Sequence, residues 1–276
     1  MEQLEGKVAV VTGAASGIGR ALAVELARRG MTIVAADVDA TSLDATLVAV
    51  HEAGCRALAV RTDVSRADDM EALAAQVTDE FGGTDLLCLN AGVFRGGLVW
   101  ESPVVDWDWV FSVNVYGSVH GIRAFVPRMI ERGTEAHVEI TSSMAGLVAT
   151  GMSGIYTVSK FAAFALAEVL AHDLASSGAP IGVSVLCPSA VATAIGESQR
   201  NREGSGPAIA SADTVESFLR DFCAAGLEPS EVAVAVVDAI RRGDFLIPTR
   251  ETFADFVRIR SDALMRKELP PFQMFD

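Results

Sequence analysis

The sequence lacks several features that would each point to a particular class of protein. Its 276 residues carry a formal net charge of −14, without the basic footprint that nucleic-acid binding needs to neutralise phosphates. The four cysteines form no CxxC pair and the four histidines show no metal-ligand spacing, which argues against a zinc site and favours buried thiols in a reducing cytosol. We expect a cytoplasmic protein with no metal and no nucleic-acid partner.

Membrane segments and leader sequences are also missing from the pattern. No stretch of about eighteen residues is continuously apolar, so we expect no membrane-spanning helix. The opening MEQLEGKVAV lacks the basic start and apolar core of a secretory signal. Half of the residues are hydrophobic, and they gather in short aliphatic runs. Such runs fit a parallel sheet covered on both faces, and the length of the chain fits one domain over residues 1–276.

Strand-like and helix-like segments alternate along the chain. The expected strands span residues 7–12, 32–37, 57–64, 85–90, 137–143, 181–188 and 245–248. The expected helices span residues 17–29, 41–53, 67–81, 106–131, 154–176 and 229–242. This alternation predicts an α/β fold, a doubly wound, Rossmann-type and mainly parallel seven-stranded sheet with helices on both faces. Pro127 predicts a kink or a break in its helix.

One long segment interrupts the alternation. Residues 194–227 place a polar, glycine-bearing stretch and an amphipathic helix between the sixth and seventh strands. Long excursions in compact domains are usually functional or disordered. We favour a substrate lid, and a mobile surface insertion is the alternative. A C-terminal extension over residues 249–276 ends in ELPPFQMFD, a candidate for docking on a neighbouring subunit.

A glycine-rich loop follows the first strand. The sequence VVTGAASGIGR leaves a strand, supplies Gly13, Gly17 and Gly19, and enters a helix. Glycines at such positions let the backbone turn sharply and approach a pyrophosphate at the helix N-terminus. Because a strand precedes the loop and a helix follows it, the motif predicts a dinucleotide site rather than an ordinary tight turn.

Acidic residues after the second and third strands bear on the choice of cofactor. Asp37 comes eighteen residues after Gly19, where its carboxylate can accept both ribose hydroxyls of an adenosine and would repel a 2′-phosphate. Neither Ser16 nor Val38 supplies a cation for that phosphate, so NAD is favoured over NADP. Asp63 is a candidate for contact with the adenine edge, and a helix N-cap is the alternative.

The chain has only two tyrosines, and one of them precedes a lysine by one helical turn. Tyr156 and Lys160 stand at i and i+4 in GMSGIYTVSK, hence on one face of the expected helix. A free tyrosine, with a pKa of about 10, is a poor base at neutral pH. An ammonium about 4 Å from the phenolate contributes about 4 kcal/mol at an effective dielectric of about 20, roughly a thousandfold in acidity. The pair predicts a tyrosine acid/base brought toward neutrality by the lysine.

These motifs resemble those of the short-chain dehydrogenase/reductase family over essentially the whole chain. The matching segments are TGAASGIG (12–19), Asp63-Val64, NAG (90–92), Asn114 in NVYG, Ser143, YTVSK (156–160) and the segment from Pro188 to Thr193. Ser143 precedes Tyr156 by thirteen residues, the interval that is usual in the family. Seven matches in the right order make the resemblance specific.

The resemblance implies a catalytic tetrad and a cofactor site. Tyr156 is then the acid/base, and Lys160 also binds the nicotinamide ribose. Ser143 hydrogen-bonds the substrate oxygen, and Asn114 anchors a water in a proton relay. The residues that the motifs and the resemblance assign to the cofactor are Gly13, Ser16, Gly17, Ile18, Gly19, Asp37, Asp63, Val64, Asn90, Ala91, Gly92, Tyr156, Lys160, Pro188, Val191 and Thr193.

Two positions depart from the family pattern. Ser189 stands where the family usually has glycine, so a positive φ there would add strain. Glu139 stands in the middle of a strand that we expect to be buried on both faces, where the family usually has an aliphatic residue. An unpaired buried carboxylate is costly, so we expect Glu139 to be protonated or to have a donor. We assign it no function from the sequence.

The expected function is that of an NAD-dependent oxidoreductase that interconverts a secondary alcohol and a ketone. The alternatives are an NADPH-dependent ketoacyl-type reductase and a non-catalytic dinucleotide-sensing regulator. Arg95 is the basic residue that stands out near the expected substrate pocket, so an apolar, aromatic or alicyclic substrate is favoured over a phosphorylated or CoA-bound one. The pocket candidates are Phe94, Leu98, Trp100, Leu147, Val148, Met152, Ile195, Phe218 and Phe222. The resemblance also implies a homotetramer or dimer, formed through the helices near 106–131 and 154–176.

Overall fold

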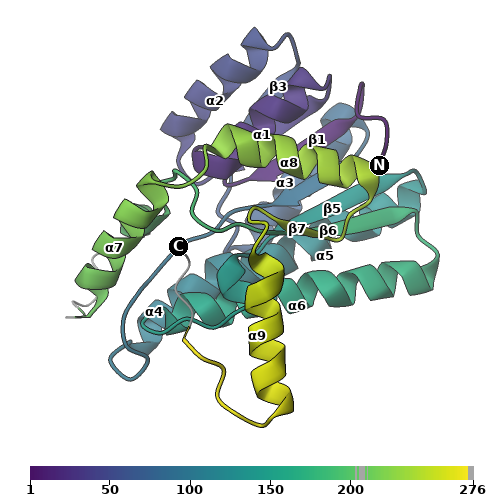
Figure 1. Cartoon of the computed structure of the whole chain (residues 1–276). Coiled ribbons are helices and arrows are strands. Elements are labelled where there is room, and N and C mark those ends of the chain that lie inside the picture. The colour runs from purple at the N-terminus through teal and green to yellow at the C-terminus, as the bar shows by residue number, and fades with distance from the viewer. Residues whose placement is uncertain (203, 205–208, 210, 273–276) are drawn as a thin grey trace.

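The computed structural model contains one seven-stranded sheet with helices on both faces (Figure 1). It describes residues 1–202, 204, 209 and 211–272. The parts of the expected lid and C-terminal extension that fall on residues 203, 205–208, 210 and 273–276 lie outside the described residues. The strands are β1 (Val8–Thr12), β2 (Thr32–Asp37), β3 (Ala57–Arg61), β4 (Leu86–Leu89), β5 (Ala136–Thr141), β6 (Ile181–Cys187) and β7 (Leu246–Pro248).

All strand pairs are parallel, and the order across the sheet is β3-β2-β1-β4-β5-β6-β7. This order confirms the expected doubly wound α/β fold. The direction of winding reverses between β1 and β4, and the carboxyl ends of all the strands meet at one edge. Ligands of open α/β sheets bind outside the carboxyl ends at such a reversal point.

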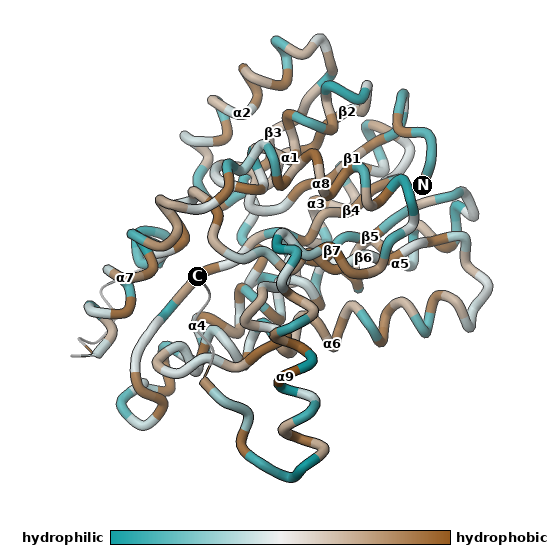
Figure 2. Tube along the Cα trace, in the orientation of Figure 1, coloured by the Kyte–Doolittle hydropathy of each residue, from teal (hydrophilic) through white to brown (hydrophobic). Residues whose placement is uncertain are grey.

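The helices enclose two apolar cores, one on each face of the sheet. They are α1 (Gly17–Arg28), α2 (Ala40–Glu52), α3 (Ala67–Phe81), α4 (Val104–Phe111), π-helical η1 (Ser112–Tyr116), α5 (Gly117–Arg132), η2 (Met144–Gly146), α6 (Gly154–Ser177), η3 (Ile195–Asn201), α7 (Ala212–Ala224), α8 (Pro229–Arg242) and α9 (Phe253–Met265). Residues of α1 and α8 form one core with one side of the strands, and residues of α3, α5 and α6 form the other. In Figure 2 the trace around β1, β4, α1 and α8 is largely brown, as the aliphatic runs predict.

The region near residues 106–131 differs from the single helix that the sequence predicts. It consists of α4, η1 and α5, and the irregular segment is the π-helical η1 rather than Pro127. The expected break at Pro127 is wrong, since α5 continues through it. Phe125, Val126 and Met129 pack into the core around the proline, and this packing outweighs the lost backbone hydrogen bond. Single π-helical turns often mark functional sites, and η1 carries Asn114.

Helix α6 is the described helix whose length and hydropathy would suit a membrane span. The same composition is typical of a core helix. Ala163, Ala167 and Leu170 of α6 are buried against the sheet, and α6 carries Tyr156 and Lys160. The apolar character of α6 therefore has an explanation within this fold.

Candidate active site

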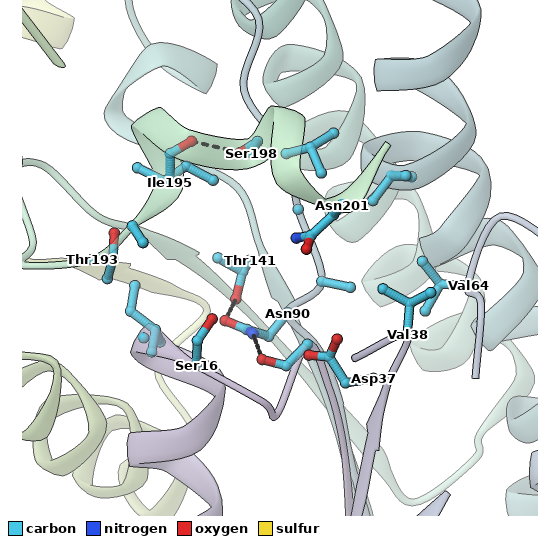
Figure 3. A pocket seen from close by; sticks show the side chains of 18 of the residues that line it. Ser16, Asp37, Val38, Val64, Asn90, Thr141, Thr193, Ile195, Ser198 and Asn201 are labelled. Carbon is cyan, nitrogen blue, oxygen red and sulfur yellow. Dashed lines mark hydrogen bonds between the residues drawn. The ribbon is translucent and has the colours of Figure 1, made fainter. Parts of the chain in front are cut away.

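A cavity of about 590 Å³ lies at the carboxyl edge of the sheet, where the loops after β1 to β6 meet residues of the 194–227 segment (Figure 3). The expected cofactor residues that line it are Gly13, Ser16, Gly17, Ile18, Asp37, Asp63, Val64, Asn90, Ala91, Gly92, Tyr156, Lys160, Pro188, Val191 and Thr193. Ser143 lines it too, whereas Gly19 and Asn114 do not. The fold thus brings nearly all of the expected residues to one place.

The glycine-rich loop has a conformation that needs glycine. Gly13 and Gly17 have φ values of 68° and 52°, in the left-handed region that favours glycine. A Cβ on Gly19 would lie 2.1 Å from the carbonyl oxygen of Gly13, so Gly19 serves the close packing of the loop on α1 rather than contact with a ligand. The Asn90 side-chain amide donates to the Thr12 carbonyl at 3.0 Å and ties the loop to the end of β4.

Polar side chains at both ends of the cavity are free to meet a dinucleotide. Ser16 precedes α1, and its side chain makes no capping hydrogen bond, so the hydroxyl and the helix N-terminus can receive a phosphate. The buried Ser189 hydroxyl has no hydrogen-bond partner among the described residues. Ser189 is absent from the described non-glycine residues with positive φ, so the strain considered for this position does not arise. Its backbone N–H donates to Thr249 Oγ1 at 2.9 Å.

Asp37 and Asp63 line the end of the cavity where we expect the adenosine of a dinucleotide, which we call the adenosine end. Asp37 accepts from the backbone N–H of Ala15 at 2.9 Å and from that of Asp39 at 3.0 Å, and its oxygens keep lone pairs toward the cavity. Asp63 accepts from the backbone N–H of Ser65 at 2.9 Å. The residue that precedes α3 as its N-cap is Arg66, so the alternative that Asp63 caps this helix is wrong.

Two arginines at the adenosine end were missed by the sequence analysis. Arg61 ends β3 beside Asp37 in the parallel register, and both it and Arg200 of η3 line the cavity. The position of Arg61 could have been inferred from the strand ends alone. Arg200, whose guanidinium donates to the Ala194 carbonyl at 2.7 Å, is brought there only by the tertiary fold. Asn201 of η3 also faces Asp37 and Val38 across the cavity (Figure 3).

Three members of the expected tetrad converge on one point of the cavity. The Tyr156 ring packs on Phe94 with centroids 4.9 Å apart, and the Ser143 side chain hydrogen-bonds to the phenol. Lys160 Nζ lies 5.6 Å from the centroid of the Tyr156 ring and donates to the Thr141 carbonyl at 2.9 Å. The one-turn spacing on α6 and the end of β5 produce this convergence.

The ionisation of this pair differs from what the spacing alone suggests. Burial raises the pKa of Tyr156 to about 12, although the hydrogen bond from Ser143 lowers it. Burial lowers the pKa of Lys160 to about 8. The protein's own groups therefore do not lower the pKa of the Tyr156 phenol toward 7. Loss of hydration disfavours both the charged tyrosine and the charged lysine.

Asn114 holds the π-helical segment against the end of β4. Its Oδ1 accepts from the Val93 backbone N–H at 2.8 Å, and its Nδ2 donates to the Val93 carbonyl at 3.0 Å and to Ser159 Oγ at 2.9 Å. A Cβ on Gly92 would lie 3.3 Å from Lys160 Nζ and 3.5 Å from Asn114 Oδ1. The glycine therefore leaves room between the lysine and the asparagine, where the relay water of the family pattern would lie.

The predicted lining of the substrate pocket agrees least with the structure. Of the nine candidates only Ile195 lines the cavity, and Phe94 contacts Tyr156 from behind. Trp100 and Phe218 are 80% and 56% exposed. Other residues that the sequence did not suggest also line the cavity, among them Trp109, Ser198 and Cys223. Sequence periodicity cannot show which side of a loop faces the cavity. The residues that line the substrate pocket can therefore be assigned only from the three-dimensional structure.

Among the described residues, Arg95 belongs to a buried cluster of four charged side chains. Its Nε donates to Asp106 at 2.9 Å and one terminal nitrogen donates to Glu216 at 2.8 Å. Arg202 donates to the other oxygen of Asp106 at 2.6 Å. The cluster joins the loop after β4 to residues on both sides of the 203–210 stretch. Arg95 is therefore committed to carboxylates of the protein itself.

Comparisons with known proteins agree with the geometry of this site. The family model described as short chain dehydrogenase matches residues 7–204. The chain therefore belongs to the short-chain dehydrogenase/reductase family. A 1-deoxy-11-beta-hydroxypentalenate dehydrogenase from Streptomyces exfoliatus is 40% identical over 205 residues, which are 74% of each chain.

Two solved structures extend the likeness to the fold. A short chain dehydrogenase/reductase from Burkholderia phymatum in complex with NAD superposes with a TM-score of 0.95 at 39% identity, over 100% of both chains. The apo form of LigO from Sphingobium sp. strain SYK-6 superposes with a TM-score of 0.82 at 32% identity, over 97% of this chain and 90% of that one. The protein is thus an oxidoreductase of this family, with the family's sheet and a nicotinamide dinucleotide site.

Proposed function

We propose that the protein interconverts a secondary alcohol and a ketone with NAD as hydride carrier. The observation that carries the proposal is the convergence of Tyr156, Ser143 and Lys160 on the cavity that the glycine-rich loop also lines. A bound nicotinamide supplies the hydride acceptor or donor. A tyrosine acid/base beside it supplies the proton chemistry that an alcohol needs.

The side chains divide the work on the substrate oxygen. Tyr156 takes the hydroxyl proton during oxidation and returns it during reduction. The Ser143 hydroxyl, already hydrogen-bonded to the phenol, donates to the same substrate oxygen and orients it. The Lys160 ammonium stabilises the phenolate when Tyr156 has lost its proton. Asn114 holds the loop after β4 in place through both of its amide atoms.

The choice of NAD rests on Asp37 at the end of β2. Its carboxylate faces the cavity, and the Burkholderia phymatum structure with which this chain superposes contains NAD. Arg61 and Arg200 at the same end are the observation that favours the second candidate, an NADPH-dependent reductase, because a guanidinium can pair with a 2′-phosphate. Measuring the affinity for both dinucleotides decides between the two.

The substrate class follows from the charges around the cavity. Arg95 and Arg202 are paired with Asp106 and Glu216, so these arginines hold no spare charge for an anionic substrate. Ile195, Val191 and Cys223 line the same cavity as Tyr156, and Cys223 is close enough to interact electrostatically with the phenol. These features support a neutral and largely apolar alcohol or ketone. The Streptomyces exfoliatus relative is named as a dehydrogenase of a hydroxy compound.

The remaining proposals concern the lid, assembly and location. Residues on both sides of the 203–210 stretch line the cavity, which supports a substrate lid over about residues 194–227. Exposed apolar side chains on η1, α5 and α6 support a dimer or tetramer through these helices; they are Tyr116, Ile130, Val158 and Val169. Four free cysteines, three of them buried, support a cytoplasmic location.

The test is a panel of secondary alcohols and ketones, followed through the absorbance of the reduced cofactor. Apolar aromatic and alicyclic alcohols should be oxidised with NAD⁺, while phosphorylated and CoA-bound substrates should not. A protein that binds NAD but converts none of the panel would instead support the sensing alternative. Exclusive turnover of acyl thioesters with NADPH would establish the ketoacyl-type alternative.

A further inference from the structure

A carboxyl group lies in the middle of the sheet on a strand that is buried on both faces. Glu139 of β5 is 0% exposed and pairs in register with Cys88 of β4 and Ser184 of β6. On its face of the sheet α1 and α8 present aliphatic side chains. Its hydrogen-bond donor is Thr141, whose hydroxyl donates to Glu139 Oε1 at 2.9 Å. Oε2 has no partner among the described residues.

Thr141 connects this acid to the catalytic lysine. Its hydroxyl binds Glu139, and its carbonyl oxygen accepts from Lys160 Nζ at 2.9 Å. The same hydroxyl lies 3.5 Å from Asn90 Oδ1, an approach that Figure 3 shows on the cavity floor. Asn90 in turn holds the glycine-rich loop. The buried carboxyl is therefore one residue away from both Lys160 and the residue that anchors the cofactor loop.

Among the groups that interact electrostatically with Glu139, Lys160 is the one that carries a positive charge. They are Lys160 of α6, Cys88 of β4 and Cys187 of β6. Burial raises the pKa of the Cys88 and Cys187 thiols, so both stay neutral at physiological pH. Burial raises the pKa of Glu139 to about 7, while the Thr141 hydrogen bond and the charge of Lys160 oppose that rise.

We propose that Glu139 is a positioning residue for the Tyr156–Lys160 pair: its carboxylate keeps the Lys160 side chain charged and, through Thr141, holds it beside Tyr156. The inference rests on the function proposed above. The ammonium favours the phenolate of Tyr156, so Glu139 acts on the acid/base through Lys160 and touches neither substrate nor cofactor. Without the carboxylate, Lys160 loses its proton at a lower pH.

The chain offers a direct measurement of this effect, because it contains only three lysines, Lys7, Lys160 and Lys267. Protein labelled with ¹³C at the lysine ε-carbons gives one NMR signal for each, and Lys7→Arg and Lys267→Arg assign them. The titration needs neither substrate nor dinucleotide. In Glu139→Gln the midpoint of Lys160 should fall by about one pH unit. In Thr141→Val, which keeps the carboxylate, it should fall by clearly less.

The parent protein provides a second readout that does not depend on the folding of a variant. Its Lys160 signal should show an additional inflection near pH 7, where Glu139 titrates. Equal midpoints in the parent and in Glu139→Gln overturn the proposal, as does a shift in Thr141→Val as large as that in Glu139→Gln. If Glu139→Gln does not fold, absence of the inflection in the parent overturns it.

The effect on turnover separates this inference from the proposed function. In an active parent, the alkaline limb of the pH profile of kcat/KM should move in Glu139→Gln to lower pH by the same amount as the lysine midpoint, because activity needs the ammonium. If Glu139 only packed the core, its substitution would change the overall rate without shifting the alkaline limb of the pH profile. A shifted lysine midpoint in a protein that oxidises no alcohol would refute the proposed function and leave the coupling intact.

Discussion

Asp37 at the end of β2 accepts a hydrogen bond from the backbone N–H of Ala15 in the glycine-rich loop, with 2.9 Å between nitrogen and oxygen. One carboxylate thus supports the glycine-rich loop and also lines the cavity, at the end where we expect the adenosine. Its charge and its hydrogen-bonding role can be separated by substitution, since an amide oxygen keeps the acceptor and removes the charge.

We expect Asp37→Asn to raise the affinity for NADP⁺ relative to NAD⁺ by about tenfold, because a 2′-phosphate no longer meets a carboxylate and finds Arg61 and Arg200 nearby. Titration of both dinucleotides by protein fluorescence measures the ratio. Asp39→Asn is the matched control, since Asp39 is exposed and caps α2, and it should leave the ratio unchanged. An unchanged ratio in Asp37→Asn would show that this carboxylate does not select the cofactor.

Removal of the phenolic hydroxyl should abolish proton transfer without disturbing the cavity. Tyr156→Phe is expected to lower kcat by about a hundredfold or more, the contribution typical of a general acid/base, while the affinity for the dinucleotide changes little. The only other tyrosine, Tyr116, is 55% exposed. Tyr116→Phe therefore serves as the control and should turn over like the parent. Equal rates for the two variants would remove Tyr156 from the mechanism.

The buried charge cluster should be sensitive to the loss of its shared acceptor. Asp106 accepts from both Arg95 and Arg202, so Asp106→Asn removes the negative charge that two buried guanidinium groups share. The free energy of unfolding should fall by about 3 kcal/mol, as measured by denaturant titration. Asp108 lies two residues away and is exposed, and Asp108→Asn should change stability by less than about 0.5 kcal/mol.

His137 should make stability fall on acidification. Burial lowers the pKa of His137 to about 3 from its ordinary value of 6.5. At a pH between these two values, His137 is protonated in the unfolded chain and neutral in the folded protein. Stability contributed by the neutral ring is therefore complete above about pH 6.5 and is lost as the pH falls toward 3.

The whole contribution of this histidine is on the order of 5 kcal/mol. Denaturant titrations between about pH 4 and 7 should reveal most of it, because this range lies within the interval between its two pKa values. The slope of unfolding free energy against pH should be smaller in His137→Gln than in the parent. The exposed His172 is the control, and His172→Gln should keep the parent slope. Identical slopes for both variants would contradict a buried neutral His137.

From the sequence alone we could predict the sheet, the glycine-rich loop and the Tyr156–Lys160 pair, because these depend on local patterns, whereas Ser143 and Asn114 were assigned through the family resemblance. Aliphatic runs alternating with helical periodicity specify parallel strands and crossovers, and parallel strands necessarily bring Gly13, Asp37, Asn90 and Ser143 to one edge. The one-turn spacing of Tyr156 and Lys160 likewise follows from helix geometry alone.

Features that depend on groups far apart in the chain could be seen only in the three-dimensional structure. Burial, which is a property of the whole fold, raised the pKa of Tyr156 where the spacing predicted the opposite. Long-range pairing committed Arg95 to Glu216, and packing kept α5 helical through Pro127. A side chain's hydration and partners are set by segments that local periodicity does not connect, so the substrate wall and the ionisation of the site appeared only in three dimensions.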